Sequence, residues 1–299
     1  MATASTSGTE RPVDAVALAH IATRLNAATE PPWLHREVAK RMAERLPLIR
    51  QQPRRIVDWQ TRLGASGDVL HSACPRATLV AVEAGTPRRL QRAPTRWWPP
   101  SRWSSRVSGI APDDVADAST DLLWCNMAMH FEADIEALMQ RWRRAIAVDG
   151  FLMFSTLGPG SLGGLRRVYR ERAWPAPMAP LVDMHDLGDM LVHAGFAEPV
   201  MDQEILTLTW PTAAAMLAEL RSLGGNADRA RATGLRTPRW RVALEAACDA
   251  LRGSDGRLRL EFELIYGHAF CAAPRVPFGA EASVSLEQMR TMVRERRRG

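Results

Sequence analysis

Lysine is almost absent from this 299-residue sequence, because Lys40 is the only one and arginine supplies the other basic side chains. The formal net charge is +6 and the isoelectric point is about 9.8, values that often accompany nucleic-acid binding. The arginines are nevertheless spread along the chain, apart from a short cluster at 294–298. The bias towards arginine fits the base composition of the gene better than a binding surface, so we expect no nucleic-acid partner.

Cysteine is also scarce, and long hydrophobic runs are missing. Four cysteines (Cys74, Cys125, Cys248, Cys271) lie far apart without CxxC spacing, which indicates reduced thiols and argues against disulfides or a zinc site. No apolar run reaches the length of a membrane span, and the start MATASTSGTERPV has no apolar signal core. We therefore expect a cytoplasmic protein with no membrane contact and no metal.

The remaining composition, 46% hydrophobic and 24% charged, is typical of a globular protein. We predict one α/β domain over residues 15–273, opening with a helical cap. Residues 1–14 are expected to form a disordered tail, and residues 274–299 a basic C-terminal helix or tail. Residues 87–108 mix proline with arginine and tryptophan, which predicts an irregular insert.

The central stretch, residues 121–157, has the pattern of a βαβ unit. An apolar run, Leu122–Trp124, ends at Asn126, and a helix follows with apolar residues at three- and four-residue intervals. We expect Asp149–Gly150 to stop that helix before a second buried strand, Phe151–Phe154. Ligands of parallel sheets bind beyond the carboxyl ends of the strands, so Asn126 and the loop Ser155–Gly160 are expected at the site.

An earlier part of the chain has the layout of a nucleotide site. Strand Ile56–Asp58 ends in an acidic residue and runs into a turn, and strand Thr78–Val82 is followed by Glu83. A carboxylate after the second strand can accept hydrogen bonds from ribose hydroxyls. Helix capping is the ordinary alternative for each acid taken alone. Further on, strands over 198–208 and 258–270 predict an antiparallel edge on an otherwise parallel sheet.

Several segments resemble the biotin-synthesis O-methyltransferases that esterify malonyl-acyl carrier protein. They are DLLWCNMAMHF, FLMFSTLGPGSLGGLR, LVDMHDLGDMLVHAGF, LTLTW and AELRSLGGN, and the resemblance extends over about 34–273. It implies a Rossmann-like, seven-stranded methyltransferase sheet that binds S-adenosylmethionine, with methyl transfer to a free carboxylate. It also implies an acyl carrier protein, or another acidic protein, as the partner. A monomer is expected.

The resemblance places the cofactor at Asp58, Gly64, Glu83 and Asn126, while His130, Asp183 and His185 are candidates on the substrate side. No catalytic residue can be assigned. The family's first loop reads D-x-G-x-G-x-G, but this chain has Gln60 and Arg62 at the first two glycine positions. An alternative therefore stays open, a non-catalytic relative that acts as a binding or assembly protein. The related respiratory-complex assembly factor, which modifies a protein arginine, is similar in the same segments.

Overall fold

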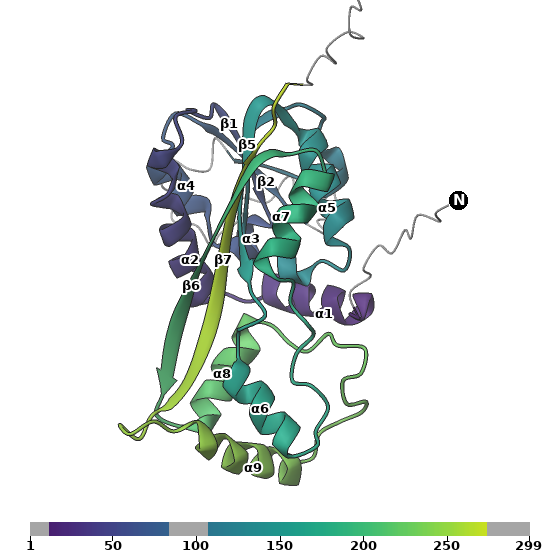
Figure 1. Ribbon diagram of the computed structural model, residues 1–299, viewed down its shortest axis with the longest axis vertical. Coiled ribbons are helices and arrows are strands. Elements are labelled where there is room, and N and C mark those ends of the chain that lie inside the picture. The colour runs from purple at the N-terminus through teal and green to yellow at the C-terminus, as the bar shows by residue number, and fades with distance from the viewer. Residues whose placement is uncertain (1–11, 84–106, 274–299) are drawn as a thin grey trace, which may run out of the picture.

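The computed structural model describes residues 12–83 and 107–273 (Figure 1). The rest of the chain, including residues 87–106 of the expected insert and the basic segment 274–299, lies outside the described residues. Val13 and Asp14, which we expected in the disordered tail, are placed: Val13 is buried and Asp14 caps the first helix. Residues 107–108, expected in the insert, belong to a strand.

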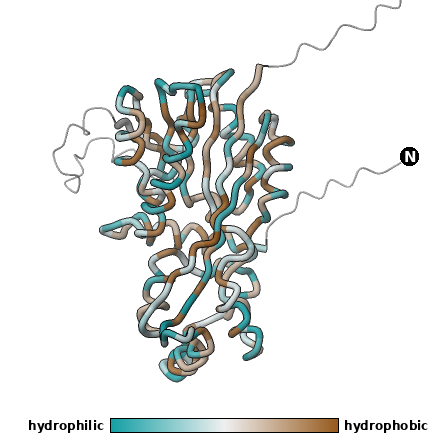
Figure 2. Tube along the Cα trace, turned by 60° about the vertical axis from the view of Figure 1, so that its left-hand side comes forward, coloured by the Kyte–Doolittle hydropathy of each residue, from teal (hydrophilic) through white to brown (hydrophobic). Residues whose placement is uncertain are grey.

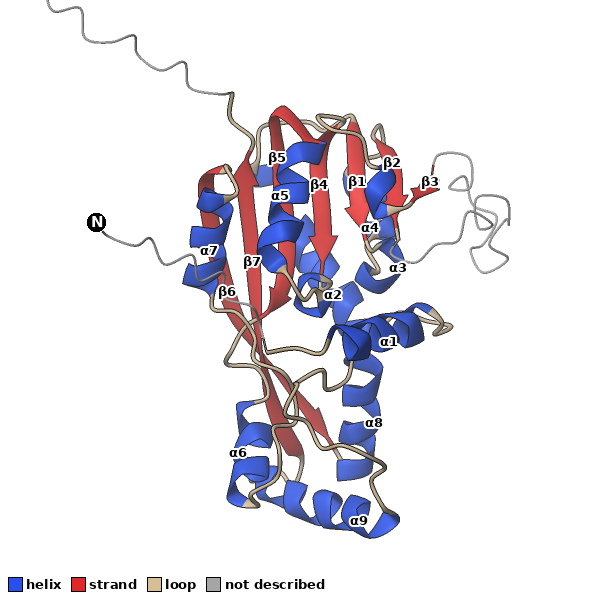
Figure 3. Cartoon of the chain, turned by 90° about the vertical axis from the view of Figure 1, so that its right-hand side faces the viewer, coloured by secondary structure: helices blue, strands red, loops and turns tan. Residues whose placement is uncertain are grey.

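In the described part of the chain, seven strands form one sheet, as the resemblance implied, and their order is β3-β2-β1-β4-β5-β7-β6 (Figure 3). Their bounds are β1 Arg55–Trp59, β2 Thr78–Val82, β3 Val107–Ile110, β4 Thr120–Asn126, β5 Ile146–Leu157, β6 Ala197–Trp210 and β7 Leu258–Phe270. The first five strands pair in parallel, whereas β7 runs antiparallel to both β5 and β6. The predicted antiparallel edge is therefore confirmed.

Helices cover both faces of the sheet. Their bounds are α1 Ala15–Asn26, α2 Trp33–Ala43, α3 Thr61–Gly64, α4 Gly67–Ala73, α5 Ile135–Ala145, α6 Gly163–Glu171, α7 Met184–His193, α8 Ala213–Leu223 and α9 Pro238–Ala247. Buried strand residues alternate between the two faces. Leu122 and Trp124 of β4 pack in the core that α2, α4, α6, α8 and α9 share, while Leu123 and Cys125 face α1, α5 and α7.

The link between α5 and β5 differs from our expectation. The helix ends at Ala145, and Asp149–Gly150 lie inside β5, where the pairing with β4 shifts register between Thr120 and Leu122. A Cβ on Gly150 would lie 2.9 Å from the carbonyl oxygen of Asp121. The glycine therefore allows a bulge in a strand, which a sequence pattern does not distinguish from a helix stop.

Strands β6 and β7 extend beyond the rest of the sheet as a two-stranded ribbon. Residues 258–263 of β7 pair with β6 alone, because β5 pairs only with residues 264–270. Helices α6, α8 and α9 pack on this ribbon, and together they form what we call the lobe (Figures 1 and 3). Hydrophobic segments run through the middle of the sheet, and hydrophilic ones lie mainly around it (Figure 2). Within the described ranges, no helix has the length and hydrophobicity needed to span a bilayer.

Candidate functional site

The strand arrangement brings four of the expected site residues to one edge of the sheet. Asp58 lies near the end of β1, Glu83 directly follows β2, and Asn126 ends β4. Gly64 lies against Asn126, since a Cβ on this glycine would be 3.1 Å from the Asn126 carbonyl oxygen. The carboxyl ends of parallel strands meet at the same edge, so side chains distant in sequence surround one region.

Asp58, which is buried, and Glu83, which is half-buried, form an acidic pair. Asp58 is 2% exposed, and in residues 12–83 and 107–273 neither of its carboxylate oxygens has a hydrogen-bond partner. The nearby Thr61 hydroxyl donates instead to the Asp58 backbone carbonyl, at 2.8 Å. Burial, and then the charge of Glu83, raise the pKa of Asp58 well above its usual range. Burial also raises the pKa of Glu83 to about 7. Asp58 thus has two oxygens available to a ligand within the described residues, and pKa values shifted in this way cluster at functional sites.

The first loop differs from an open glycine-rich turn. Thr61–Gly64 form the short helix α3, and the Arg62 backbone N–H donates to a Glu83 carboxylate oxygen at 2.7 Å. Gln60 has φ 58° and ψ 51°, a left-handed conformation that glycine adopts at little cost. Its N–H donates to the Val82 carbonyl at 2.7 Å, which joins the ends of β1 and β2. Gln60 therefore takes up the backbone geometry that favours glycine without being glycine.

Asn126 connects three elements under this loop. Its Nδ2 donates to the backbone carbonyls of His35 at 2.7 Å and Gly64 at 2.5 Å, and its Oδ1 accepts from the Ser155 hydroxyl at 2.7 Å. The side chain is fully buried. These bonds fix the positions of α2, the first loop and β5 relative to one another. We therefore interpret Asn126 as a residue that shapes the site.

Two buried residues at this edge were missed by our reasoning from sequence. His35, on the apolar face of α2, lies 2.7 Å through Nδ1 from the Leu63 carbonyl, and burial lowers the pKa of its imidazole to about 4. It is therefore neutral and supports the first loop as a donor. Ser66, 0% exposed, accepts a hydrogen bond from the Trp124 indole at 2.8 Å. A polar side chain within an apolar helix face was the available signal for His35.

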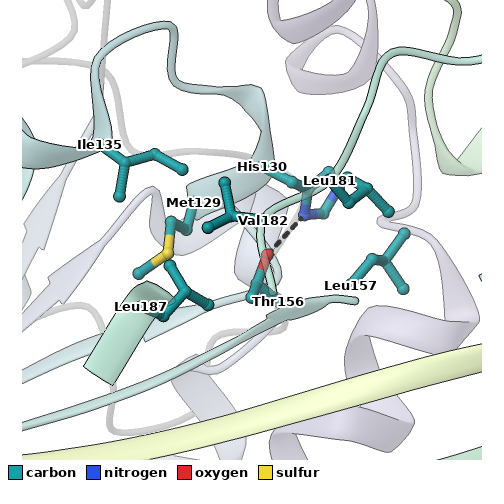
Figure 4. A pocket seen from close by; sticks show the side chains of 8 residues that line it. All are labelled: Met129, His130, Ile135, Thr156, Leu157, Leu181, Val182 and Leu187. Carbon is teal, nitrogen blue, oxygen red and sulfur yellow. Dashed lines mark hydrogen bonds between the residues drawn. The ribbon is translucent and has the colours of Figure 1, made fainter. Parts of the chain in front are cut away.

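A small pocket opens beside the ends of β4 and β5 (Figure 4). It measures about 180 Å³ including its open mouth, and its lining is Met129, His130, Ile135, Thr156, Leu157, Leu181, Val182 and Leu187. His130 Nδ1 lies 3.4 Å from the Thr156 hydroxyl across this pocket, a long contact. The lining is mainly apolar, with His130 and Thr156 as its polar groups.

The other two substrate candidates lie apart from this pocket. Asp183 caps α7 by accepting from the His185 backbone N–H at 2.8 Å, and it also pairs with the His185 ring at 2.7 Å. These hydrogen bonds lower the pKa of Asp183. The His185 side chain is 82% exposed. The pair therefore acts as a surface helix cap, while Leu181 and Val182 just before it reach the pocket. Among the described residues, no cluster of three or more His, Cys, Asp or Glu side chains could hold a metal ion.

The curated proteins that are similar to this chain in sequence share one name. The malonyl-[acyl-carrier protein] O-methyltransferase of Gallionella capsiferriformans is 37% identical over 250 residues, covering 81% of this chain and 86% of that protein. The protein of the same name from Laribacter hongkongensis is 36% identical over 251 residues, and the one from Nitrosospira multiformis 34% over 259. No model in a scan of protein families matches the chain.

Solved structures agree with the fold. The YcgJ protein of Bacillus subtilis superimposes with a TM-score of 0.51 at 12% identity, covering 80% of this chain and 99% of its own. A candidate methyltransferase from Bacillus halodurans gives the same TM-score at 13% identity. At such identities the likeness shows the Rossmann-like methyltransferase fold alone, whereas the curated relatives are similar in sequence over most of their length. The chain therefore belongs to the malonyl-[acyl-carrier protein] O-methyltransferase family.

Proposed function

We propose that this protein transfers a methyl group from S-adenosylmethionine to the free carboxyl of a malonyl thioester carried by an acyl carrier protein, a step of biotin synthesis. The observation that carries the proposal is 37% identity to a protein of that name over 81% of this chain. A cytoplasmic location and a monomeric state belong to the same proposal. Cell fractionation and sedimentation would test them.

The acidic pair at the ends of β1 and β2 fits the nucleoside part of this cofactor. Its hydroxyl groups are donors, and Asp58 presents two buried oxygens without partners among the described residues. We propose that Glu83 and Asp58 hold the nucleoside, with the loop Gln60–Gly64 beside the methionine part. When bound, the cofactor would supply an electrophilic methyl group on its sulfonium.

The residues of the site then have to position the two substrates and exclude water. A malonyl carboxylate is already an anionic nucleophile at neutral pH, so the reaction needs no general base. The apolar side chains around His130 and Thr156 could hold the acyl chain, with the histidine and the hydroxyl as its polar contacts. The hydrogen bonds of Asn126 keep the first loop and β5 at fixed positions around the reacting groups. Such alignment can account for most of the rate enhancement in a methyl transfer of this kind.

The non-catalytic alternative rested on the changed first loop, and no comparison favours it. Gln60 lies in the left-handed conformation that glycine favours, so its presence does not by itself change the course of the backbone. The loop therefore gives a weaker argument against cofactor binding than the sequence suggested. Arg62 is exposed on the helical turn α3, and its backbone N–H donates to a Glu83 carboxylate oxygen.

The test is methyl transfer with purified components. The protein would be incubated with S-adenosylmethionine and malonyl-acyl carrier protein, and the methyl ester detected by mass spectrometry. Acetyl-acyl carrier protein, which has no free carboxyl, is the matched control and should stay unmodified. Calorimetry with S-adenosylmethionine and its demethylated product measures cofactor binding separately. Failure of both the binding and the transfer would overturn the proposal.

A further inference from the structure

Charge is distributed very unevenly over the described part of the chain. The lobe segments 158–180 and 211–256 contain eleven arginines and six acidic residues, a net charge of +5. Segments 107–157 and 181–210 contain three arginines and fourteen acidic residues, a net charge of −11. Base composition of the gene explains arginine in place of lysine, but it does not explain this separation. The arginines of the lobe therefore need a closer look than the overall charge of the chain suggested.

Two arginines of the lobe lie over a pair of tryptophans that contact each other. The Trp174 and Trp240 rings, from the segments after α6 and within α9, have centroids 5.8 Å apart. The Arg236 guanidinium lies 4.1 Å from the Trp240 ring, and that of Arg172 lies 5.9 Å from the Trp174 ring. Stacking on aromatic rings restricts a guanidinium and leaves its N–H donors available to a partner. Segments far apart in sequence thus form one surface.

This surface has the exposure and chemistry of a docking site. We name it the cationic face and define it by the two tryptophans and six exposed arginines of the same two segments: Arg167, Arg170, Arg172, Arg236, Arg239 and Arg241. Beside it, Leu235 is 101% exposed and Val242 67% exposed. Arginine and apolar side chains together are typical of the centre of a protein interface. Two of the six have an acidic neighbour on their own helix, Arg241 at 2.8 Å from Glu245 and Arg167 at 3.8 Å from Glu171.

The cationic face also lies away from the pocket at the ends of β4 and β5, as a docking surface for a carrier protein requires. The loop after β5 leads directly into α6, whose nine residues rise about 14 Å along the helix axis. Arg170 and Arg172 lie at the far end of that helix. A carrier protein presents its acyl group on a flexible thioester arm, so it docks away from the reacting carboxyl. The lobe can therefore bind the carrier while the arm reaches the pocket at the ends of β4 and β5.

We propose that the cationic face, formed by α6, α9 and the tryptophans between them, is the docking surface for the acidic acyl carrier protein. This inference rests on the proposed function, and it assigns the surface that recognises the carrier protein. Opposite charge accelerates the encounter and fixes orientation more than it strengthens the final complex. The relevant parameter is therefore the Michaelis constant for the protein substrate and its dependence on salt.

The experiment compares two variants with the same change in charge. The lobe variant is Arg170→Glu, Arg172→Glu, Arg239→Glu. The edge variant is Arg54→Glu, Arg55→Glu, Arg76→Glu, at the amino ends of β1 and β2 on the opposite edge of the sheet. Each is assayed with malonyl-acyl carrier protein and with the malonyl thioester of N-acetylcysteamine, which has no protein to dock. Thermal unfolding confirms that both variants fold.

We expect the lobe variant to raise the KM for malonyl-acyl carrier protein about tenfold, with kcat and the small thioester little affected. The edge variant should resemble the wild type. Equal KM values for the two variants would overturn the docking surface, as would preferential binding of a single-stranded RNA oligonucleotide to the cationic face. If the wild type methylates neither thioester, the proposed function itself fails. Wild-type transfer to the carrier protein with no difference between the variants refutes the docking surface alone.

Discussion

Replacing Glu83 with glutamine should make the protein more stable at alkaline pH. Burial raises the pKa of this carboxyl from 4.5 to about 7, so the folded protein holds a proton that the unfolded chain releases. Between these two values the folded state binds more protons, and the free energy of unfolding therefore falls as pH rises. A difference of 2.5 pKa units corresponds to about 3.4 kcal/mol of lost stability above pH 7.

Glu83→Gln removes this titration and keeps an oxygen that can accept from the Arg62 N–H. Urea unfolding of both proteins at pH 5, 6, 7 and 8 measures the difference. The stability of the variant relative to the wild type should rise by about 2.5 kcal/mol between pH 5 and pH 8. A constant difference across this range would show that Glu83 ionises normally in the folded protein, and the reasoning would be refuted. At pH 8, where the wild-type carboxyl is ionised, the same variant should bind S-adenosylmethionine about tenfold more weakly, because a charged acceptor is lost.

Three further substitutions test the first loop, the support that Asn126 gives it, and the packing between β5 and β7. Gln60→Gly should relieve the left-handed strain and tighten cofactor binding, with unfolding free energy changed by less than about 1 kcal/mol; a higher calorimetric dissociation constant would contradict this. Gly267→Ala places a Cβ 2.4 Å from the Phe154 ring and should lower the free energy of unfolding in urea by about 1–3 kcal/mol. A negligible change would mean that the ring moves aside. Asn126→Ala removes three buried hydrogen bonds and should cost about 3 kcal/mol, with Asn126→Asp as a matched comparison; an unchanged denaturation midpoint would refute its structural role.

Much of the fold could be predicted from the sequence because local patterns agreed with tertiary structure. The strands Thr78–Val82 and Leu258–Phe270 begin and end where apolar runs and turn residues indicated. In each case the residues of one short segment are enough to predict the element. The seven-stranded sheet was implied by the resemblance and is confirmed, whereas its strand order is known only from the structure.

Features that depend on contacts between distant segments could not be predicted in this way. The role of Gly150 depends on the close approach of Asp121 in the neighbouring strand. The helical turn α3 depends on hydrogen bonds to β2 and to Glu83. The cationic face needs α6 and α9 side by side, although about 70 residues separate them in the sequence. The positions of Asp58 and Glu83 were expected, but their mutual effect on pKa required the folded geometry.

The ribbon formed by the outer halves of β6 and β7 has a consequence for how members of this family can diverge. The lobe is encoded by two connections, one after β5 and one between β6 and β7, while the acidic pair and the first loop come from the first third of the chain. Insertions or exchanges in the lobe leave the pairing of β1, β2, β4 and β5 untouched. Choice of carrier and retention of the methyl donor can therefore evolve as separate traits. Grafting the two lobe connections of one family member onto the sheet of another would separate them experimentally.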